Sequence, residues 1–254
     1  MKITDRIIIW IDVLKSFIYT FWGIKANIVS SNETVNIILN ERKSLIRFGD
    51  GEFGIYRGKN IHYQCWSEQL RDEFVKIKQD YEKQIENSNF LLAIPKRFIS
   101  IPGWILMKKR VYVSSWAQSR YDYKKEWNHS ICYGDSFLFE KKNKDIYGEL
   151  WRSDKTPEHI IFIHNDNKFA DLFTTTYSKK VKFIKCPAKN AFEKIDFLEN
   201  EVLETIKKYH WDKKDVMLVV SAGPAGKILI YRLCKKNIWG IDAGHCWDDP
   251  LEGV

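Results

Sequence analysis

The sequence predicts an α/β protein built on a doubly wound, mainly parallel sheet. Three short β-type runs lie in the last hundred residues, at 160–163, 181–184 and 216–220, and enough chain for a helix separates each from the next. One separating segment, 191–209, places its apolar side chains at helical spacing. Strands that alternate with helices favour a parallel sheet, because the return to the start of the next parallel strand takes a helix-length connection.

The first half of the chain continues this pattern less regularly. Residues 44–48 and 90–94 are apolar enough to be buried strands, and Pro95 ends the second of them. Between them, 67–87 repeats apolar residues at three-and-four spacing, which predicts a helix. The region 102–142 is rich in Trp and Tyr, and we expect helices there that carry aromatic side chains toward a cleft. The other expected elements are a helix near 32–39 that Asn32-Glu33-Thr34 would cap, an extended segment at 131–139, helices at 145–151 and 225–236, and a final strand at 238–242.

Residues 1–30 predict an amphipathic, aromatic helix that precedes a single domain spanning 31–254. Asp12 and Lys15 interrupt its two apolar runs, whose combined length is near the lower limit for a membrane span, so we do not predict a transmembrane helix. Basic residues on both sides would suit a helix lying on an anionic membrane leaflet. Packing against the domain, or against a second subunit in a homodimer, explains the same pattern.

Composition limits the class of partner. A formal net charge of +8 and a pI of about 9.1 favour anionic ligands or surfaces. The Lys and Arg residues are scattered and no nucleic-acid motif is present, so we expect no nucleic-acid partner. Five widely spaced cysteines without a C-x-x-C pair indicate neither a disulfide framework nor a zinc site, which favours a reducing, cytoplasmic compartment.

The stretch 44–54 concentrates the most chemistry. Gly49, Asp50, Gly51 and Glu52 follow the first predicted strand, at the sheet edge where ligands of open α/β proteins bind. Two carboxylates one residue apart are suited to a hard divalent cation, and Arg47 has the planar donor geometry that phosphate prefers. A solvated hairpin turn explains the same residues about equally well.

Two later strand ends add polar residues to the same edge. Ser221 to Lys227 follows a strand and opens a helix, so its backbone N–H groups could hold a phosphate, although it lacks the residues of a Walker A loop. An ordinary strand-to-helix turn is the alternative. Asp242 to Asp249 contains His245, which could act as a general base or as a ligand, and a surface loop is again the alternative. Asn190 could cap the following helix or contact a base or ribose, and the polar run 164–168 has a similar position.

Four blocks together resemble the glycosyltransferases of the GT-D fold, a family long known as a domain of unknown function in bacterial surface-glycan clusters. The blocks are Arg47-Phe48-Gly49-Asp50-Gly51-Glu52, Cys186-Pro187-Ala188-Lys189-Asn190-Ala191-Phe192, Ser221-Ala222-Gly223-Pro224-Ala225-Gly226-Lys227 and Ile241-Asp242-Ala243-Gly244-His245. They occur in the family's order, and the resemblance covers about residues 31 to 250. Four blocks in order are more specific than any one of them.

The resemblance implies a Rossmann-like α/β domain of the GT-D type. It also implies transfer of a sugar from a nucleotide-sugar donor, usually a UDP-sugar, to a bacterial surface-glycan, lipid-linked glycan or glycoprotein acceptor. Asp50 and Glu52 would then hold Mn²⁺ or Mg²⁺. The expected catalytic residues are His245, Asp242 and Asp248. The expected nucleotide-sugar-binding residues are Arg47, Gly49, Gly51, Lys189, Asn190, Ser221, Ala222, Gly223 and Lys227.

The segments 137–141 and 164–168 depart from the family's pattern, so the donor sugar is not specified by the resemblance. We expect a cytoplasmic enzyme that is peripheral at the inner face of the plasma membrane. Two alternatives stay open: a metal-dependent phosphoester hydrolase that uses Asp50 and Glu52, and a non-catalytic subunit that binds a nucleotide or glycan.

Overall fold

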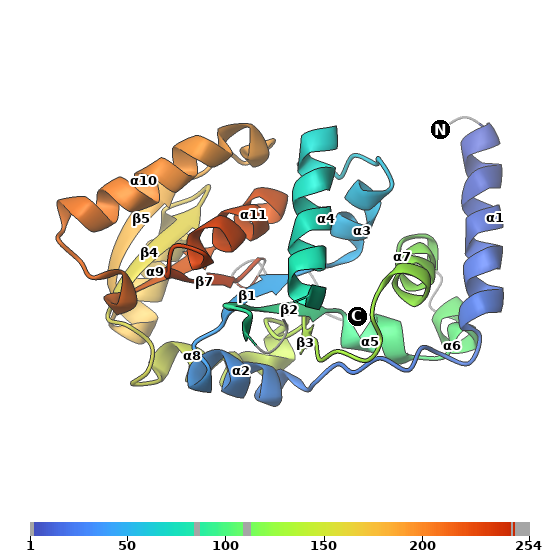
Figure 1. Cartoon of the computed structure of the whole chain (residues 1–254), viewed down its shortest axis with the longest axis horizontal. Coiled ribbons are helices and arrows are strands. Elements are labelled where there is room, and N and C mark those ends of the chain that lie inside the picture. The colour runs from blue at the N-terminus through green and yellow to red at the C-terminus, as the bar shows by residue number, and fades with distance from the viewer. Residues whose placement is uncertain (1–2, 84–86, 109–112, 245, 247–254) are drawn as a thin grey trace.

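The computed structural model describes residues 3–83, 87–108, 113–244 and 246, which contain one seven-stranded sheet (Figure 1). All of its strand pairs are parallel, and the strand order is β3-β2-β1-β7-β6-β4-β5. The strands are β1 (Ser44–Arg47), β2 (Phe90–Ile94), β3 (Gly134–Asp135), β4 (His159–His164), β5 (Lys180–Lys185), β6 (Val216–Val220) and β7 (Trp239–Asp242). The predicted doubly wound parallel sheet is confirmed.

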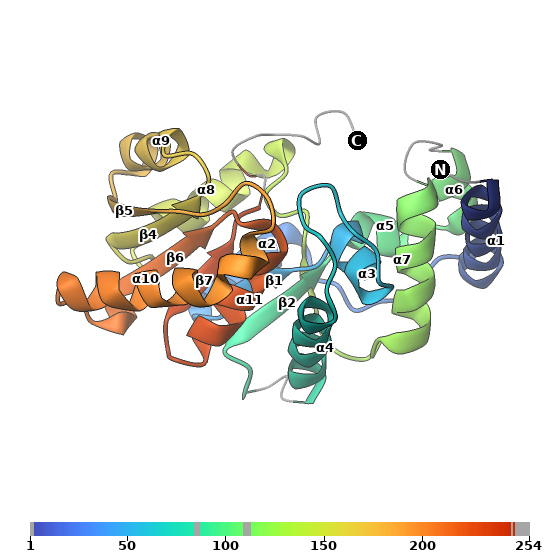
Figure 2. The same ribbon diagram turned by 90° about the horizontal axis from the view of Figure 1, so that it is seen from above.

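Helices cover both faces of this sheet. On one face lie α4 (Glu68–Lys83), α10 (Ile195–Lys208) and α11 (Gly223–Cys234), and on the other lie α2 (Ser31–Asn40), α8 (Lys144–Arg152) and α9 (Lys168–Tyr177) (Figures 1 and 2). Every residue of β2, β6 and β7 is therefore buried. Strands buried on both faces are continuously apolar, which is why these runs are readable in the sequence.

A group of helices lies beyond the β3 end of the sheet. It contains α1 (Ile3–Thr20), α5 (Lys96–Ser100), α6 (Gly103–Lys108) and α7 (Val113–Glu126), and α1 packs against α7 (Figure 2). The predicted N-terminal helix is confirmed, whereas the division of the chain near residue 30 stays a prediction. Within the described ranges, no helix is both long and apolar enough to cross a membrane.

Two predicted elements differ from the structure. The extended segment at 131–139 is wrong for most of its length: only Gly134 and Asp135 pair with β2, after which the chain turns at Ser136. Its apolar residues are buried in irregular structure, which leaves the same sequence signal as a strand. The helix expected over 191–209 begins as a 3₁₀ turn, Ala191–Lys194, before α10. Asn190 precedes this turn in the left-handed backbone conformation, with φ of 52°.

Candidate active site

The strand ends that the sequence singled out surround one cavity of about 690 Å³. It lies at the carboxyl edge of the sheet and is lined by residues that follow β1, β4 and β6, together with the loop at 61–64. The predicted binding residues that line it are Arg47, Gly49, Gly51, Ser221, Ala222, Gly223 and Lys227, and both predicted metal ligands, Asp50 and Glu52, line it as well. The hairpin alternative for 44–54 is wrong, because a helix follows β1.

That helix, α3 (Asp50–Tyr56), directs the two predicted metal ligands apart. Residues two positions apart on a helix do not face each other. Asp50 is exposed, whereas Glu52 is buried and accepts the Gly49 N–H through Oε2 at 2.7 Å. Glu52 therefore caps its own helix with one oxygen.

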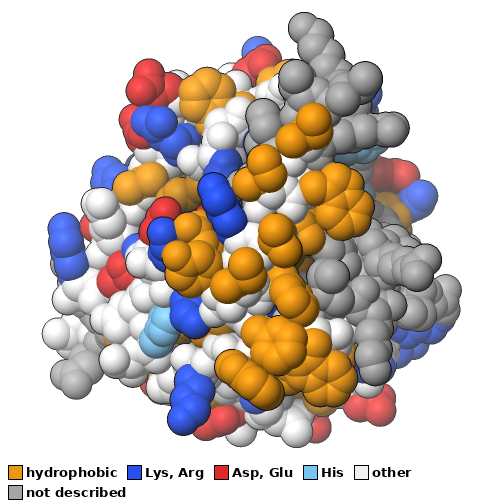
Figure 3. All heavy atoms as spheres, turned by 90° about the vertical axis from the view of Figure 1, so that its right-hand side faces the viewer, with side chains coloured by type: hydrophobic (Ala, Val, Ile, Leu, Met, Phe, Trp, Pro, Cys, Tyr) orange, Lys and Arg blue, Asp and Glu red, His pale blue; other side chains and the backbone are white. Residues whose placement is uncertain are grey.

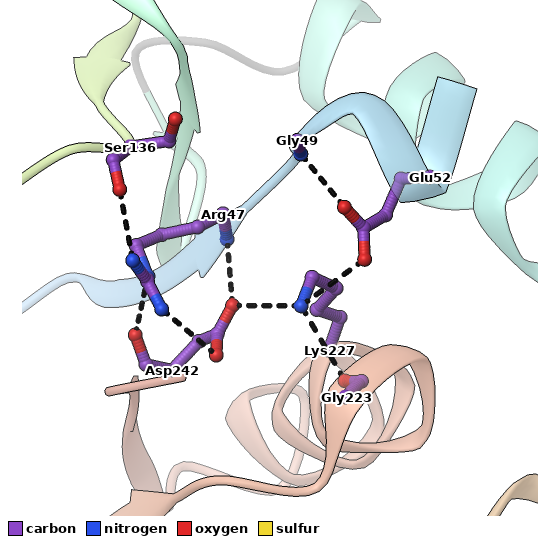
Figure 4. Close-up of polar contacts among 7 residues, drawn as sticks. All are labelled: Arg47, Gly49, Glu52, Ser136, Gly223, Lys227 and Asp242. Carbon is purple, nitrogen blue, oxygen red and sulfur yellow. Dashed lines mark hydrogen bonds and ion pairs between the residues drawn. The ribbon is translucent and has the colours of Figure 1, made fainter. Parts of the chain in front are cut away.

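Lys227 holds the other Glu52 oxygen (Figure 4). Its Nζ lies 3.2 Å from Glu52 Oε1 and 3.2 Å from Asp242 Oδ2, so an ammonium group sits between two carboxylates. All three side chains are at least nine-tenths buried. A cation of the chain itself thus holds the position between these two carboxylates.

Arg47 joins this cluster from β1 (Figure 4). Its Nε donates to the Asp242 carbonyl at 2.6 Å, and its Nη1 donates to the Ser136 carbonyl at 2.8 Å. Nη2 lies 3.6 Å from Asp242 Oδ1, and the Arg47 backbone N–H donates to Oδ2 at 3.3 Å. Arg47 therefore ties the ends of β1 and β7 to the turn after β3.

The cluster is electrically balanced, because Arg47 and Lys227 offset Glu52 and Asp242. Burial alone would lower the pKa of Lys227, but attraction by Asp242 and Glu52 raises it above the usual lysine value. Burial alone would raise the pKa of Asp242, but Lys227 and Arg47 hold it below its usual range. Both groups are therefore charged at neutral pH.

Asp242 does not line the cavity, and only 1% of its surface is exposed. It lies beneath Arg47 and Lys227 and fixes both. Its predicted part in catalysis stays a prediction, and its geometry is that of a positioning residue. His245 and Asp248 lie outside the described residues, although Gly244 and Cys246 both line the cavity.

The turn before α11 presents a helix N-terminus to the cavity. Gly223 has φ of 54°, Pro224 occupies the first turn, and Ser221 and Ala222 also line the cavity. The N-terminal N–H groups of a helix favour a negative charge. A Cβ on Gly223 would meet the ring of Tyr63, so glycine is required both by backbone conformation and by this close approach.

Asn190 holds the loop that carries Tyr63, and it does not line the cavity. Its Oδ1 accepts the Cys65 N–H at 2.8 Å, and its own N–H donates to the Tyr63 carbonyl at 2.9 Å. Burial raises the pKa of Tyr63 to about 12, with Glu52 adding to the effect, so its hydroxyl is neutral at physiological pH. Lys189 is exposed and is likewise not a lining residue. Nucleotide binding by Asn190 or Lys189 stays a prediction.

One wall of the cavity is aromatic. The rings of Phe98 and Trp116 are stacked, with centroids 4.2 Å apart and planes at 7°, and Phe137 packs at their edge. Glu140 lies beside them, buried and paired with Arg97 at 2.6 Å. The expectation that helical aromatics of 102–142 reach a cleft is confirmed for Trp116, whereas Tyr123, Trp127 and Tyr133 are buried in the core.

The polar segment after β4 divides between cavity and surface. His164 is buried and its Nδ1 accepts the Asp166 N–H at 3.0 Å, so in the neutral ring the proton is on Nε2. His164 and Asn165 line the cavity. Asp166 and Lys168 do not, and they form an exposed pair at 3.2 Å.

These features place the chain in the class of α/β proteins that bind a ligand at the carboxyl edge of a parallel sheet. The family model described as "Glycosyltransferase GT-D fold" matches residues 45–249, and the chain belongs to this family.

Curated relatives and solved structures agree with this assignment. The chain is 27% identical over 237 residues to "Glycosyltransferase GlyD" of Streptococcus pneumoniae, covering 84% of this chain and 26% of that protein. It is 22% identical over 237 residues to "Probable glycosyl transferase Gly" of Streptococcus gordonii, covering 86% and 32%. The chain thus spans about a quarter to a third of the length of these relatives.

A solved glycosyltransferase from Streptococcus sanguinis superposes with a TM-score of 0.71 at 19% identity, covering 88% of this chain and 83% of that one. A structure of the domain of unknown function 1792, described as a distinct glycosyltransferase fold, gives a TM-score of 0.68 at 20% identity, covering 95% and 83%. The predicted GT-D-type fold is therefore confirmed.

Gly244 provides a test of how closely Arg47 is held. Its φ is 52°, and a Cβ there would overlap Arg47 Nη2. We expect Gly244→Ala to destabilise the fold by more than the roughly 1 kcal/mol that a left-handed alanine costs. Gly58→Ala is the matched control, since Gly58 has φ of 76° and a Cβ there would meet only an ordinary contact with the Trp66 ring at 3.9 Å. Equal denaturant midpoints for the two variants would contradict crowding at Arg47.

Proposed function

We propose that the cavity binds a nucleoside diphosphate sugar, with UDP-sugars as the first candidates, and that the protein transfers the sugar to a glycan acceptor. The observation that carries this proposal is the meeting of the α11 N-terminus with the Arg47–Lys227 cluster in a cavity of nucleotide size. Family membership supports the reaction class. The aromatic wall at Phe98 and Trp116 suits the apolar face of a sugar ring.

Sugar transfer requires that the negative charge developing on the leaving diphosphate be stabilised. The N–H groups of the turn at 221–223 would donate hydrogen bonds to its negatively charged oxygens, and Lys227 and Arg47 would lie beneath it. Because both cations are fixed by Asp242, their positions would not have to reorganise as charge develops on the leaving group. An acceptor hydroxyl must also lose a proton, and His245 or an acidic residue is proposed for that step.

The predicted Mn²⁺ or Mg²⁺ stays a prediction. The residues as they lie do not fit a two-carboxylate clamp, since Asp50 and Glu52 diverge and both Glu52 oxygens have partners. Among the described side chains, no group of three or more His, Cys, Asp or Glu residues is arranged to hold a metal. The positive charges that would lie beneath the leaving diphosphate are therefore those of Arg47 and Lys227, without an ion.

Calorimetry with UDP and UDP-sugars tests the proposal, in Mn²⁺, in Mg²⁺ and in EDTA. Asp50→Asn removes the exposed carboxylate and leaves Glu52, Lys227 and Asp242 unsubstituted, and Asp72→Asn, on the exposed face of α4, is its control. We expect UDP binding by the wild type. If Asp50→Asn alone abolished a metal-dependent increase in affinity, Asp50 would be a metal ligand. Equal affinity for UDP in EDTA and in Mn²⁺ or Mg²⁺ would show that nucleotide binding does not need the ion.

The same experiment separates the two alternatives. Release of free sugar from a UDP-sugar without an acceptor would favour the hydrolase. Tight binding with no turnover in the presence of acceptor glycans would favour a binding subunit. If the folded wild type bound no nucleotide at all, the proposed function would fail.

A further inference from the structure

Helix α1 turns apolar side chains outward and buries polar ones, which is the opposite of an ordinary amphipathic helix on the surface of a globular protein. The side toward α7 buries Val13, Ser16 and Thr20, two of which are hydroxyl residues. Ser16 Oγ donates to the Ala117 carbonyl, and Thr20 Oγ1 donates to the Ser16 carbonyl. The inner side of α1 is thus partly polar and is held by hydrogen bonds.

The outer side of α1 is apolar and exposed. We call it the N-terminal apolar face; it consists of Ile7, Trp10, Ile11, Leu14 and Ile18 of α1 and Trp22 just after the helix, which are between 46% and 86% exposed. Trp104 lies beside it at the start of α6, where the Gly103 N–H donates to the Phe21 carbonyl at 2.9 Å. On the side of the molecule where α1 lies, hydrophobic side chains gather into one area of the surface (Figures 1 and 3). A contiguous exposed apolar area of this kind is typical of a docking surface.

Basic residues accompany this face. Lys15, Lys25, Lys124 and Lys125 are exposed on α1, after it and on α7. Lysine and arginine side chains border and interrupt the apolar area (Figure 3). Indole rings between apolar and charged groups are the composition of an interfacial helix, because Trp favours the headgroup region and Lys favours anionic lipid.

A second copy of the chain is a less suitable occupant. A two-fold contact would bring the same face of each copy together, and with it the same lysines. An anionic lipid surface offers acyl chains to the apolar side chains and phosphate groups to the lysines. Charge complementarity therefore selects lipid over self-association.

We infer that the N-terminal apolar face lies on an anionic lipid bilayer, with its Trp and aliphatic side chains in the headgroup region and its lysines facing lipid phosphates. The inference reaches the cavity through Arg120, whose guanidinium donates to the carbonyls of Thr20 and Phe98. Thr20 ends α1, and Phe98 belongs to the aromatic wall. If the proposed function holds, the lipid surface and the sugar-binding wall are joined by one side chain, which suits a lipid-linked acceptor.

Flotation with vesicles tests this inference on the full chain. The vesicles contain phosphatidylcholine alone, or phosphatidylcholine mixed with phosphatidylglycerol. The test variant is Trp10→Glu/Leu14→Glu/Trp22→Glu. The control is Leu172→Glu/Phe197→Glu, which places charges at two other exposed apolar residues, one on α9 and one on α10. Circular dichroism and the urea denaturation midpoint confirm that each variant is folded.

We expect the wild type and the control to float with the anionic vesicles. The vesicle partition coefficient of the test variant should fall more than about tenfold. Failure of the wild type to float, or equal flotation of the test variant, would overturn the inference. A wild-type dimer that the test variant converts to monomer, without vesicle binding, would overturn it in favour of a second copy. UDP binding is read separately, so a failed docking surface is distinguished from a failed nucleotide site.

Discussion

Replacing Lys227 by Met should destabilise the fold by about 3–5 kcal/mol and abolish nucleotide binding. The ammonium group lies 3.2 Å from each of two buried carboxylates, and Met fills similar volume without the charge. Glu52 would then keep a buried negative charge with no cation beside it, while Asp242 would rely on Arg47 alone. Urea denaturation measures the stability term, and calorimetry with UDP measures the binding term.

Two further variants identify the cause. Lys235→Met removes a lysine at the C-terminal cap of α11, where its pair with Asp80 is partly exposed, and should cost about 1 kcal/mol or less. Glu52→Gln/Lys227→Met removes the cation together with one of its two anions and leaves the Arg47–Asp242 pair. We expect this double variant to be more stable than Lys227→Met, yet unable to bind nucleotide. A single variant as stable as wild type would refute the buried-cluster account.

The same cluster predicts how stability depends on pH. The pKa of Asp242 is lower in the folded protein than its unfolded value of about 3.9, so its contribution is present above that pH and is lost on acidification below it. The pKa of Lys227 is higher when folded than its unfolded value of about 10.4, so its contribution is present below that pH and is lost as pH rises beyond it. Stability from this cluster therefore spans the range from about pH 4 to 10.

The sequence predicted the sheet well because buried parallel strands leave a simple signal. The runs at 90–94 and 216–220 are apolar throughout, bounded by residues that end strands, and both are strands in the structure. The edge strand β3 has only two residues, which is too short for any periodicity. The apolar pattern of 131–139 therefore indicated that these side chains are buried, and it did not indicate that the segment pairs with a strand along its whole length.

The candidate site was predicted in part, for a similar reason. Residues that directly follow strands, such as Asp50 and Ser221, could be placed at the carboxyl edge from strand order alone. Tyr63 and Glu140 could not, because each reaches the cavity from a loop whose path depends on distant contacts, including Asn190 for the Tyr63 loop. Nor could spacing alone show that α3 begins at Asp50 and turns Glu52 away from it.

Arg120→Met should destabilise the protein by about 3 kcal/mol or more. Arg120 is fully buried, and its guanidinium donates to three carbonyls of α5 and its end, those of Phe98, Ile99 and Ile101, at 2.6 to 3.1 Å. It also donates to the carbonyl of Thr20 at 2.9 Å and to its hydroxyl at 3.2 Å. Burial lowers the pKa of Arg120 to about 10, so the group is still charged at neutral pH.

Arg120→Lys separates geometry from charge. A lysine keeps the positive charge, but a single ammonium group cannot reach acceptors on two sides as a planar guanidinium does, so we expect it to recover less than half of the lost stability. Hydrogen exchange should show faster opening of α1 and α5 in both variants, while β6 remains protected. Wild-type exchange in α1 of Arg120→Met would contradict the link, since the N-terminal apolar face and the aromatic wall would then be held together without this side chain.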